Sequence, residues 1–265
     1  MANVPPEERF ESGIDAWLSG LGMVRDAVRQ ELVSRQISAH LSALGGPLRV
    51  LDAGCGQGTQ AIALARLGHE VVGIDLSDAL LETARSTAAA EPDEVRQRLT
   101  FEVGDVLALA DGHIENYDLV CCHGVAMYLP SLEETVGVLA EATRSGGLIS
   151  LLTRNRAGIA MRAGMTGRWT ECIGAFEART YDNRLGIESV RADEPGEVQL
   201  ALERAGVTTI AWYGVRLFTD HWGHEPPGND FPDLLAAEEE AGHRDPFRSV
   251  AALTHTIARV EATNR

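Results

Sequence analysis

One stretch of the sequence, from Leu48 to Asp75, constrains the fold more than any other: LRVLDAGCGQGTQAIALARLGHEVVGID. It opens with a short apolar run, which predicts a buried strand of a parallel sheet. Glycines then follow at alternate positions, where they permit a sharp turn and let a ligand approach the main chain. These glycines are Gly54, Gly56 and Gly58. A helical pattern ended by Gly68 and a second strand complete the unit.

The last residue of this stretch, Asp75, stands at the carboxyl end of the second predicted strand. An acid about 20 residues beyond the glycines is where a Rossmann-type site holds a ribose hydroxyl. The glycine spacing is G-x-G-x-G, however, and not the G-x-G-x-x-G of a dinucleotide site. Asp52 also precedes the first glycine, where its charge would repel a pyrophosphate. A generic α/β nucleotide site is the alternative interpretation of the stretch.

Strands and helices continue to alternate after Asp75, and this predicts an α/β protein with a Rossmann-like, doubly wound sheet of seven strands. Further strands are expected at residues 99–103, 117–122 and 148–152, and helices at 23–44, 132–142, 195–206 and 234–241. Residues 208–218 predict a pair of terminal strands, and residues 251–258 either a helix or a closing strand.

The patterns divide the chain into four parts. They are an N-terminal helical lid (1–46), the core (47–153), an insertion covering the acceptor (154–192) and the C-terminal part of the core sheet (193–265). In the insertion, arginines are spread among glycines and aromatic residues. Aromatic faces suit a sugar or another flat ligand, and arginines suit anions or hydroxyls. The alternative for this part is an irregular surface loop.

Composition limits the partners of the protein. The chain has 265 residues, no lysine and a net charge of −16, and no basic cluster is evident, so a nucleic acid acceptor is not expected. No apolar run approaches the ~20 residues of a membrane span, and the N-terminus does not resemble a signal peptide, so we expect a cytoplasmic protein without a membrane partner. The cysteines lack zinc spacing, and no metal site is predicted.

The D-A-G-C-G-Q-G run after a strand resembles the first motif of class I S-adenosylmethionine (SAM)-dependent methyltransferases, in which this loop lies under the methionine part of SAM. Within that family, three stretches resemble the bacterial tRNA 5-carboxymethoxyuridine carboxyl methyltransferases. They are Arg29-Gln30, residues 214–220 (GVRLFTD), and residues 244–247 (RDPF) with Thr254-His255. The resemblance covers essentially the whole chain.

The resemblance implies SAM as the cofactor and a set of residues that hold it. The expected cofactor-binding residues are Arg29, Gly54, Cys55, Gly56, Asp75, Leu76, Asp105, Val106 and His123. Class I enzymes of this size are often dimers, so a homodimer is one expectation that follows from it.

The chain departs from the tRNA enzymes at two places. After Phe10 those enzymes have an arginine that can pair with the substrate carboxylate, whereas Glu11-Ser12-Gly13 stands here. They also have a lysine run where residues 176–190 of this chain carry acids and scattered arginines. Both changes remove positive charge, which favours a neutral acceptor. The sugar 1-O-methyltransferases of methylmannose polysaccharide synthesis are a relative that fits, and this places the expected reaction in polysaccharide biosynthesis.

A sugar hydroxyl needs a general base, and histidine suits that role at neutral pH. His123 follows the fourth predicted strand, where the ligand crevice of such a sheet lies, and is the expected base. The expected acceptor-binding residues are Trp17, Tyr128, Arg154, Trp169 and His221. The sequence thus predicts O-methylation of a small neutral acceptor such as an oligosaccharide. The alternatives are a tRNA carboxyl methyltransferase, a non-catalytic SAM-binding module and an N- or C-methyltransferase.

Overall fold

The structure, a computed structural model, describes residues 13–42, 44–111 and 116–261. The chain divides into two compact units. Unit 1 comprises residues 1–35, 152–198 and 212–255, and unit 2 comprises residues 36–151, 199–211 and 256–265. Phe10 and the residues that follow it, Glu11 and Ser12, lie outside the described part of the chain. The boundaries of these units differ from those of the four expected parts, which stay a prediction.

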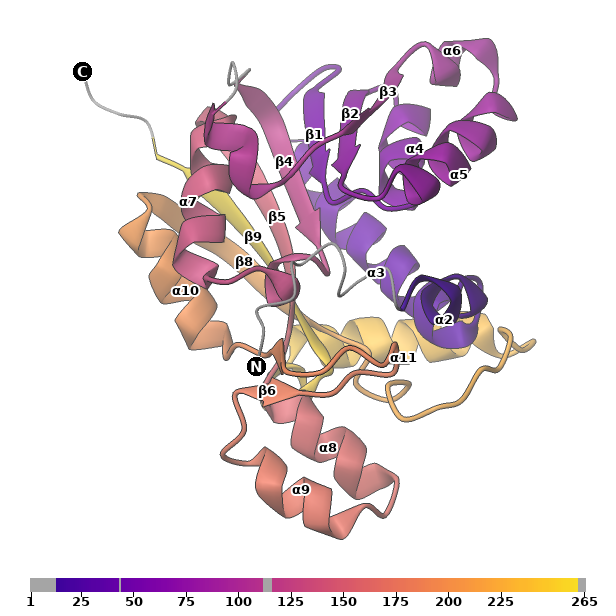
Figure 1. Ribbon diagram of the computed structural model, residues 1–265, viewed down its shortest axis with the longest axis vertical. Helices are drawn as coiled ribbons and strands as arrows, with labels where there is room; N and C mark the ends of the chain where they lie inside the picture. The colour runs from indigo at the N-terminus through magenta and orange to yellow at the C-terminus, as the bar shows by residue number, and fades with distance from the viewer. Residues whose placement is uncertain (1–12, 43, 112–115, 262–265) are drawn as a thin grey trace. The chain divides into compact units, whose positions relative to one another are not determined.

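A seven-stranded sheet forms the centre of unit 2, with the strand order β3-β2-β1-β4-β5-β9-β8 (Figure 1). The strands are β1 (Arg49–Ala53), β2 (Glu70–Asp75), β3 (Leu99–Val103), β4 (Tyr117–His123), β5 (Thr143–Arg154), β8 (Val207–Val215) and β9 (Leu253–Val260). Their middle residues are apolar and buried, as strands covered on both faces require. The predicted Rossmann-like sheet of seven strands is confirmed.

The order of the strands creates a switch point between β1 and β4. From β1 the chain builds β2 and β3 on one side and then returns to build β4 and β5 on the other. β1 pairs in parallel with both β2 and β4, with Asp52 opposite Gly73 and Cys121. Two residues further on, Gly54, Asp75 and His123 therefore leave three adjacent strands at one level. Such a switch point is where α/β sheets bind ligands.

Helices connect the strands of unit 2: α4 (Thr59–Arg66), α5 (Asp78–Ala89), α6 (Asp93–Arg96), α7 (Leu132–Ala142) and α10 (Pro195–Arg204), with the short 3-10 helices η1 (Leu107–Asp111) and η2 (Ala126–Tyr128). Ser77 begins α5 by accepting a hydrogen bond from the amide of Leu80, and Ser131 begins α7 in the same way. The helices predicted at 132–142 and 195–206 are confirmed.

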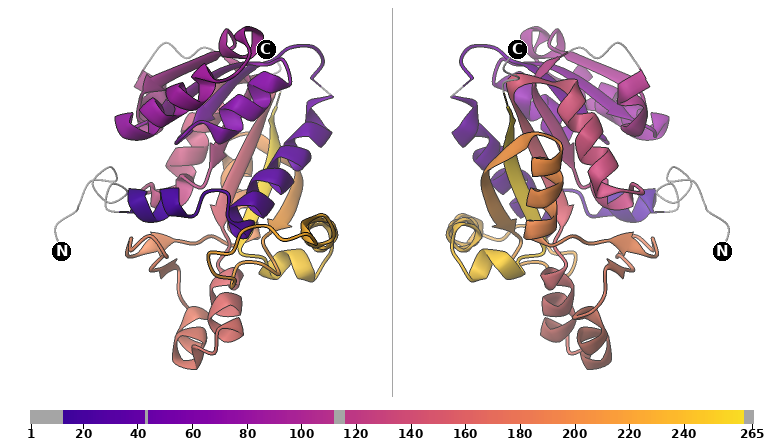
Figure 2. Two further views of the ribbon diagram at one scale, coloured as in Figure 1. Left: turned by 90° about the vertical axis from the view of Figure 1, so that its right-hand side faces the viewer. Right: turned by 90° about the vertical axis from the view of Figure 1, so that its left-hand side faces the viewer.

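Unit 1 contains more regular structure than the sequence indicates. Its helices are α2 (Ile14–Ser19), the first part of α3 (Val24–Leu41), α8 (Ala157–Met165), α9 (Trp169–Ala175), α11 (Phe231–His243) and η3 (Phe247–Val250), and it also has the strands β6 (Thr180–Tyr181) and β7 (Val190–Arg191). The α8 and α9 helices lie side by side in both views of Figure 2, around a small core of Ile159, Ala160, Ala175 and Ala192. The alternative of an irregular loop at 154–192 is therefore wrong.

The expectation of paired terminal strands at 208–218 is also wrong. Residues 208–215 belong to one strand, β8, and residues 216–218 follow it; the neighbour of β8 in the sheet is β9, near the C-terminal end of the chain. Tyr213-Gly214 consequently lies inside a strand and not at a turn. Residues 251–258, which were compatible with a helix or a strand, contribute to β9. In the described part of the chain, no helix combines the length and apolarity that a membrane crossing needs.

Candidate functional site

The glycine loop of unit 2 turns its amide groups inward. The amides of Gly54 and Cys55 both donate to the carbonyl oxygen of Ile74, at 2.8 and 2.9 Å. The amide of Gly58 donates to the carbonyl oxygen of Cys55 at 3.0 Å, and that of Gly56 to Oδ2 of Asp75 at 2.8 Å. Four amide donors of a loop that could face a ligand thus form hydrogen bonds within the protein.

The orientation of these amides selects the charge of the ligand. Loops that bind phosphate point free N–H groups at it, and this loop has already bonded four of its own. Two carboxylates, Asp52 and Asp75, act on the loop. Burial raises the pKa of the Cys55 thiol well above its ordinary value, and the negative charges of these two residues raise it further. The loop therefore offers few amide donors and lies near negative charge, which suits a cationic group.

Two glycines of the loop have no room for a side chain. Gly54 has a φ of 77°, and a Cβ there would lie 2.2 Å from Cγ2 of Val125. Gly58 has a φ of 78°, and a Cβ there would lie 2.9 Å from the ring of Phe101. Both the left-handed backbone and the close packing require glycine.

Asp75 is held in a fixed orientation at the end of β2. Its Oδ2 accepts from Gly56 as above, and its Oδ1 accepts from the amide of Ser77 at 2.9 Å. Burial raises the pKa of this carboxyl, while these backbone hydrogen bonds act to lower it. Each carboxylate oxygen has two lone pairs, so each can accept a second hydrogen bond, as from a ribose hydroxyl.

The residues expected near an adenine follow β2 and β3 in the same unit. Oδ1 of Asp105 accepts from the amide of Leu107 at 2.9 Å and so begins η1. Val106 is buried, whereas Leu76 presents an exposed apolar side chain directly after Asp75. Val103, the last residue of β3, pairs with Asp75 and is also exposed. Sheet register thus places Leu76 and Asp105 beyond the carboxyl ends of neighbouring strands.

His123 ends β4 and its ring contacts a serine that the sequence did not single out. Nε2 of His123 lies 2.8 Å from Oγ of Ser150 on β5. Ser150 is fully buried and is the one polar residue in the otherwise apolar run 148–152. That isolated polar position was the available signal for it, since a buried hydroxyl in an apolar strand needs a partner.

The remaining expected site residues are divided between the units. Tyr128 is half-buried on η2 of unit 2, and the others belong to unit 1. Trp17 is half-buried on α2, and Trp169 on α9 leaves 67% of its surface exposed. His221 is half-buried after Asp220. Arg29 on α3 forms an ion pair with Asp26 at 2.9 Å. Their roles toward a cofactor or an acceptor stay predictions.

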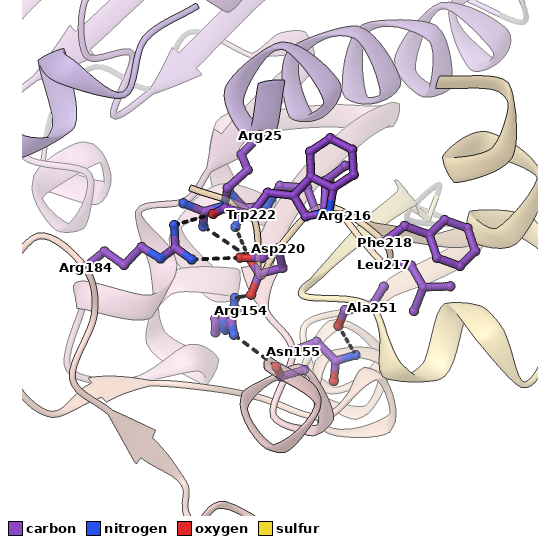
Figure 3. Close-up of polar contacts among 12 residues, drawn as sticks. Arg25, Arg154, Asn155, Arg184, Arg216, Leu217, Phe218, Asp220, Trp222 and Ala251 are labelled. Atoms are coloured by element: carbon purple, nitrogen blue, oxygen red, sulfur yellow. Dashed lines mark hydrogen bonds and ion pairs between the residues drawn. The ribbon is translucent and has the colours of Figure 1, made fainter. Parts of the chain in front are cut away.

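Arg154, also expected to bind the acceptor, belongs to a cluster of arginines that the sequence did not reveal (Figure 3). Asp220, with 7% of its side chain exposed, receives Arg25 and Arg216 on Oδ1 and Arg154 on Oδ2, each at 3.2 Å. The guanidinium of Arg154 also donates to the carbonyl oxygen of Gly158 and lies over the ring of Tyr181. Arg184 donates to the carbonyl oxygen of Asp220 at 3.2 Å.

The turn that carries this cluster is organised by Glu238 of α11. The buried carboxylate of Glu238 accepts hydrogen bonds from the amides of Leu217, Phe218 and Thr219 and from the hydroxyl of Thr219. Arg216 precedes these residues and has a φ of 61°, which is unusual for a residue with a side chain. Such strain persists where surrounding contacts over-determine the backbone, and it is frequent at functional sites.

Within the described ranges, no three histidine, cysteine, aspartate or glutamate side chains group as the ligands of a metal ion.

Comparison with known proteins finds a family model that matches the same region. A family model described as a methyltransferase domain matches residues 50–147, which include the glycine loop, Asp75, Asp105 and His123. A tRNA 5-carboxymethoxyuridine methyltransferase of Escherichia coli (strain K12) is 29% identical over 241 residues, which is 90% of each chain. A ubiquinone biosynthesis O-methyltransferase of Idiomarina loihiensis is 31% identical over 157 residues, 58% of this chain and 63% of that one.

Among solved structures, magnesium protoporphyrin IX methyltransferase of Synechocystis PCC 6803, with bound SAH, superposes with a TM-score of 0.63. The match covers 94% of both chains at 18% identity, and at this identity it bears on the fold alone.

Proposed function

Because the chain belongs to the class I SAM-dependent methyltransferases, enzymes whose cofactor is SAM, we propose that it methylates a hydroxyl oxygen of a small acceptor. The observation that carries the proposal is the glycine loop, whose inward amides and neighbouring carboxylates suit a cationic ligand. SAM, when bound, supplies a methyl group on a positively charged sulfur. Its ammonium and sulfonium charges match this loop, whereas a pyrophosphate would meet carboxylates in place of free amides.

The residues at the strand ends of unit 2 each bind a different part of the cofactor. Gly54, Cys55 and Gly56 hold the methionine part, and Asp75 accepts hydrogen bonds from the ribose hydroxyls with the lone pairs that Gly56 and Ser77 leave open. Leu76, Asp105 and Val106 hold the adenine. Arg29 is assigned to SAM on the resemblance alone.

His123 is proposed to take the proton of the acceptor hydroxyl. A hydroxyl is a weak nucleophile while protonated, and an imidazole at neutral pH can remove the proton as the new bond forms. For Nδ1 to take that proton, Nε2 must carry the ring hydrogen and donate it to Oγ of Ser150, a hydrogen bond that also fixes the orientation of the ring. Ser150 acts through His123 and is therefore a positioning residue.

Neutral sugars are the first acceptor class to test. The proposal is supported by Glu11-Ser12-Gly13, which stands where the tRNA enzymes have an arginine, and by the absence of lysine from residues 176–190. Trp17, Tyr128, Arg154, Trp169 and His221 stay the proposed acceptor-binding residues. A second candidate is the carboxyl group of a modified tRNA uridine. It is favoured by the 29% identity over 90% of the E. coli enzyme.

Mass spectrometry of two acceptor pools incubated with SAM separates these candidates. One pool holds mannose and glucose oligosaccharides, some partly methylated, and the other holds tRNA that carries carboxymethoxyuridine. A gain of one methyl in the sugars supports the hydroxyl acceptor. A gain in the tRNA alone would overturn it in favour of the carboxyl acceptor.

The His123→Ala variant tests the proposed base. We expect turnover to fall about 10²- to 10⁴-fold, since general-base catalysis contributes that much, while the folded protein still binds SAM. Ser150→Ala should give a smaller loss, and His243→Ala, at the end of α11, should leave turnover unchanged. Turnover and SAM affinity are measured separately, by product formation and by calorimetry. If His123→Ala turns over at the wild-type rate, the acceptor oxygen needs no base, as for a carboxylate.

A further inference from the structure

Two arginines of unit 1 lie in the Asp220 cluster without a carboxylate partner. Among the described residues, Arg184 donates only to main-chain oxygens, at 2.8 Å to Trp222 and 3.2 Å to Asp220. The guanidinium of Arg162 has no hydrogen-bond or ion-pair partner in the described part of the chain, and its Nε is buried. Both arginines are half-buried, and a partly desolvated cation without a counter-ion is unfavourable, so this arrangement needs an explanation.

The two charges lie close enough to repel each other. Burial lowers the pKa of Arg184 to about 10, and the charge that adds most to this effect is that of Arg162. Burial also lowers the pKa of Arg162, with Arg154, Arg168 and Arg216 contributing. Asp220 attracts both, but its carboxylate oxygens already hold three other guanidinium groups. The carboxylate of Asp220 is therefore the shared counter-charge of five arginines.

Elsewhere in the described part of the chain most arginines pair with an acid. The protein has 39 acidic residues against 23 arginines, although Arg98 in that part, like Arg184, donates only to main-chain oxygen. Arg179, for example, pairs with Glu197 at 2.8 Å, and Arg156 pairs with Glu194. A purely structural cluster could have drawn on the same abundant acids. The excess of positive charge around Asp220 is thus local and specific.

The cluster is also prepared before any ligand arrives. Glu238 fixes the turn at 217–219, and the strained backbone of Arg216 is held in place by it. Arg154 is 3% exposed and is bonded on two sides. Arg184 is likewise held by its two main-chain hydrogen bonds and so loses little freedom on binding, and planar guanidinium donors match the oxygens of a carboxylate or phosphate.

We propose that Arg162 and Arg184 bind an oxyanion group, a carboxylate, phosphate or sulfate, of a small ligand. Neither arginine is among the residues assigned to SAM, and the proposal does not depend on the proposed methyl transfer. The anion belongs either to the acceptor, at a position away from the reacting hydroxyl, or to a separate small molecule.

Binding of inorganic sulfate to the full chain, measured by calorimetry with saturating SAM and against chloride at equal ionic strength, tests the proposal. We expect saturable binding with a stoichiometry of one. Arg162→Gln and Arg184→Gln should each weaken it about tenfold or more, because each removes charge-assisted hydrogen bonds. The matched control Arg179→Gln, at an exposed arginine, should bind sulfate as the wild type does. Circular dichroism and SAM affinity establish that each variant is folded.

Sulfate binding that is not saturable, or that is equal in all four proteins, would overturn the proposal. Loss of sulfate binding when SAM is added would also overturn it, since the anion would then be the cofactor's own carboxylate. Glucuronate and glucose oligosaccharides distinguish the two sources of the anion. A preference for glucuronate that Arg162→Gln abolishes assigns the anion to the acceptor, and saturable sulfate binding without that preference assigns it to a separate molecule. None of the sulfate measurements requires turnover, so they stand even if methyl transfer to a hydroxyl is not observed.

Discussion

The glycine loop of unit 2 and the arginine cluster of unit 1 differ in the sign of their charge. At the loop, amide donors are turned inward and Asp52 and Asp75 supply negative charge. At the cluster, a single buried carboxylate, Asp220, is surrounded by five guanidinium groups. The loop is thus prepared for a cation and the cluster for an anion. The net charge of the whole chain, −16, does not indicate the charge of either region, because the loop is locally negative and the cluster locally positive.

The two regions also differ in how they are built. The loop depends on main-chain geometry that a handful of consecutive residues create. The cluster depends on side chains from α3, β5, α8 and the segments at 184 and 216–220, which meet only after folding. Substitutions should therefore act differently on them: at the loop through shape, and at the cluster through charge.

The largest effect is expected from Asp220→Asn, which removes the carboxylate and leaves the arginines buried. Breaking one partner of a buried ion pair costs about 3–5 kcal/mol, and we expect the free energy of unfolding to fall by that amount. Urea unfolding measures it. Added sulfate should restore part of the lost stability if the arginines bind anions. An unfolding free energy within about 1 kcal/mol of wild type would show that the arginines do not need Asp220.

The same variant has a pH signature. Burial alone would raise the pKa of Asp220, but Arg154, Arg216 and Arg25 outweigh burial and hold it well below its ordinary value. A carboxyl with a depressed pKa contributes stability above the unfolded value of about 3.9, and this stability is lost as the pH falls through the folded pKa. The stability gap between wild type and Asp220→Asn should stay constant from pH 7 to about 4 and narrow only below that.

A smaller effect is expected from Gly54→Ala, which tests shape at the loop. The added Cβ would lie 2.2 Å from Val125 at a φ of 77°. Overpacking and backbone strain together should cost about 2–4 kcal/mol and weaken SAM binding. Gly206→Ala is the matched control, with a φ of 73° and nothing within 4 Å of the new Cβ, and should cost only about 1 kcal/mol. An equal loss of stability in both variants would mean that the side chain of Val125 moves away from the added Cβ at little cost.

The smallest effect is expected from Asp75→Asn, which tests charge at the loop. The amide keeps the shape but has one acceptor oxygen where the carboxylate has two, and both of these are bonded here. Losing hydrogen bonds to a charged group costs about 1.5–3 kcal/mol, so calorimetry should find SAM bound about 10- to 150-fold more weakly. Asp78→Asn, at an exposed acid three residues on, should bind SAM like the wild type. Undiminished SAM affinity in Asp75→Asn would remove Asp75 from the site.

The sequence predicts the loop well because everything there is local. The glycine spacing, the strand before it and Asp75 after it lie within one stretch of 28 residues, and the parallel register follows from the alternation of strands and helices. His123 was placed correctly at the end of β4 for the same reason. Ser150 was missed because its partner lies on the neighbouring strand.

The cluster could not be predicted, since its arginines are spread from residue 25 to residue 216. Composition suggested that no basic cluster existed, because a sum over the chain hides a local excess. The prediction of two paired strands at 208–218 was wrong for a related reason. The partner of β8 comes from residues 253–260, and no local sequence pattern indicates that pairing.

The hydrogen bonds of Glu238 separate two kinds of residue in unit 1. Glu238 sets the backbone of the 217–219 turn, whereas the guanidinium of Arg162 has no partner in the described part of the chain. The side chain at position 162 can therefore be exchanged at little structural cost, while that at 238 cannot. For protein engineering, this makes the helix α11 a constant frame and position 162 the variable one at which a new selectivity could be selected.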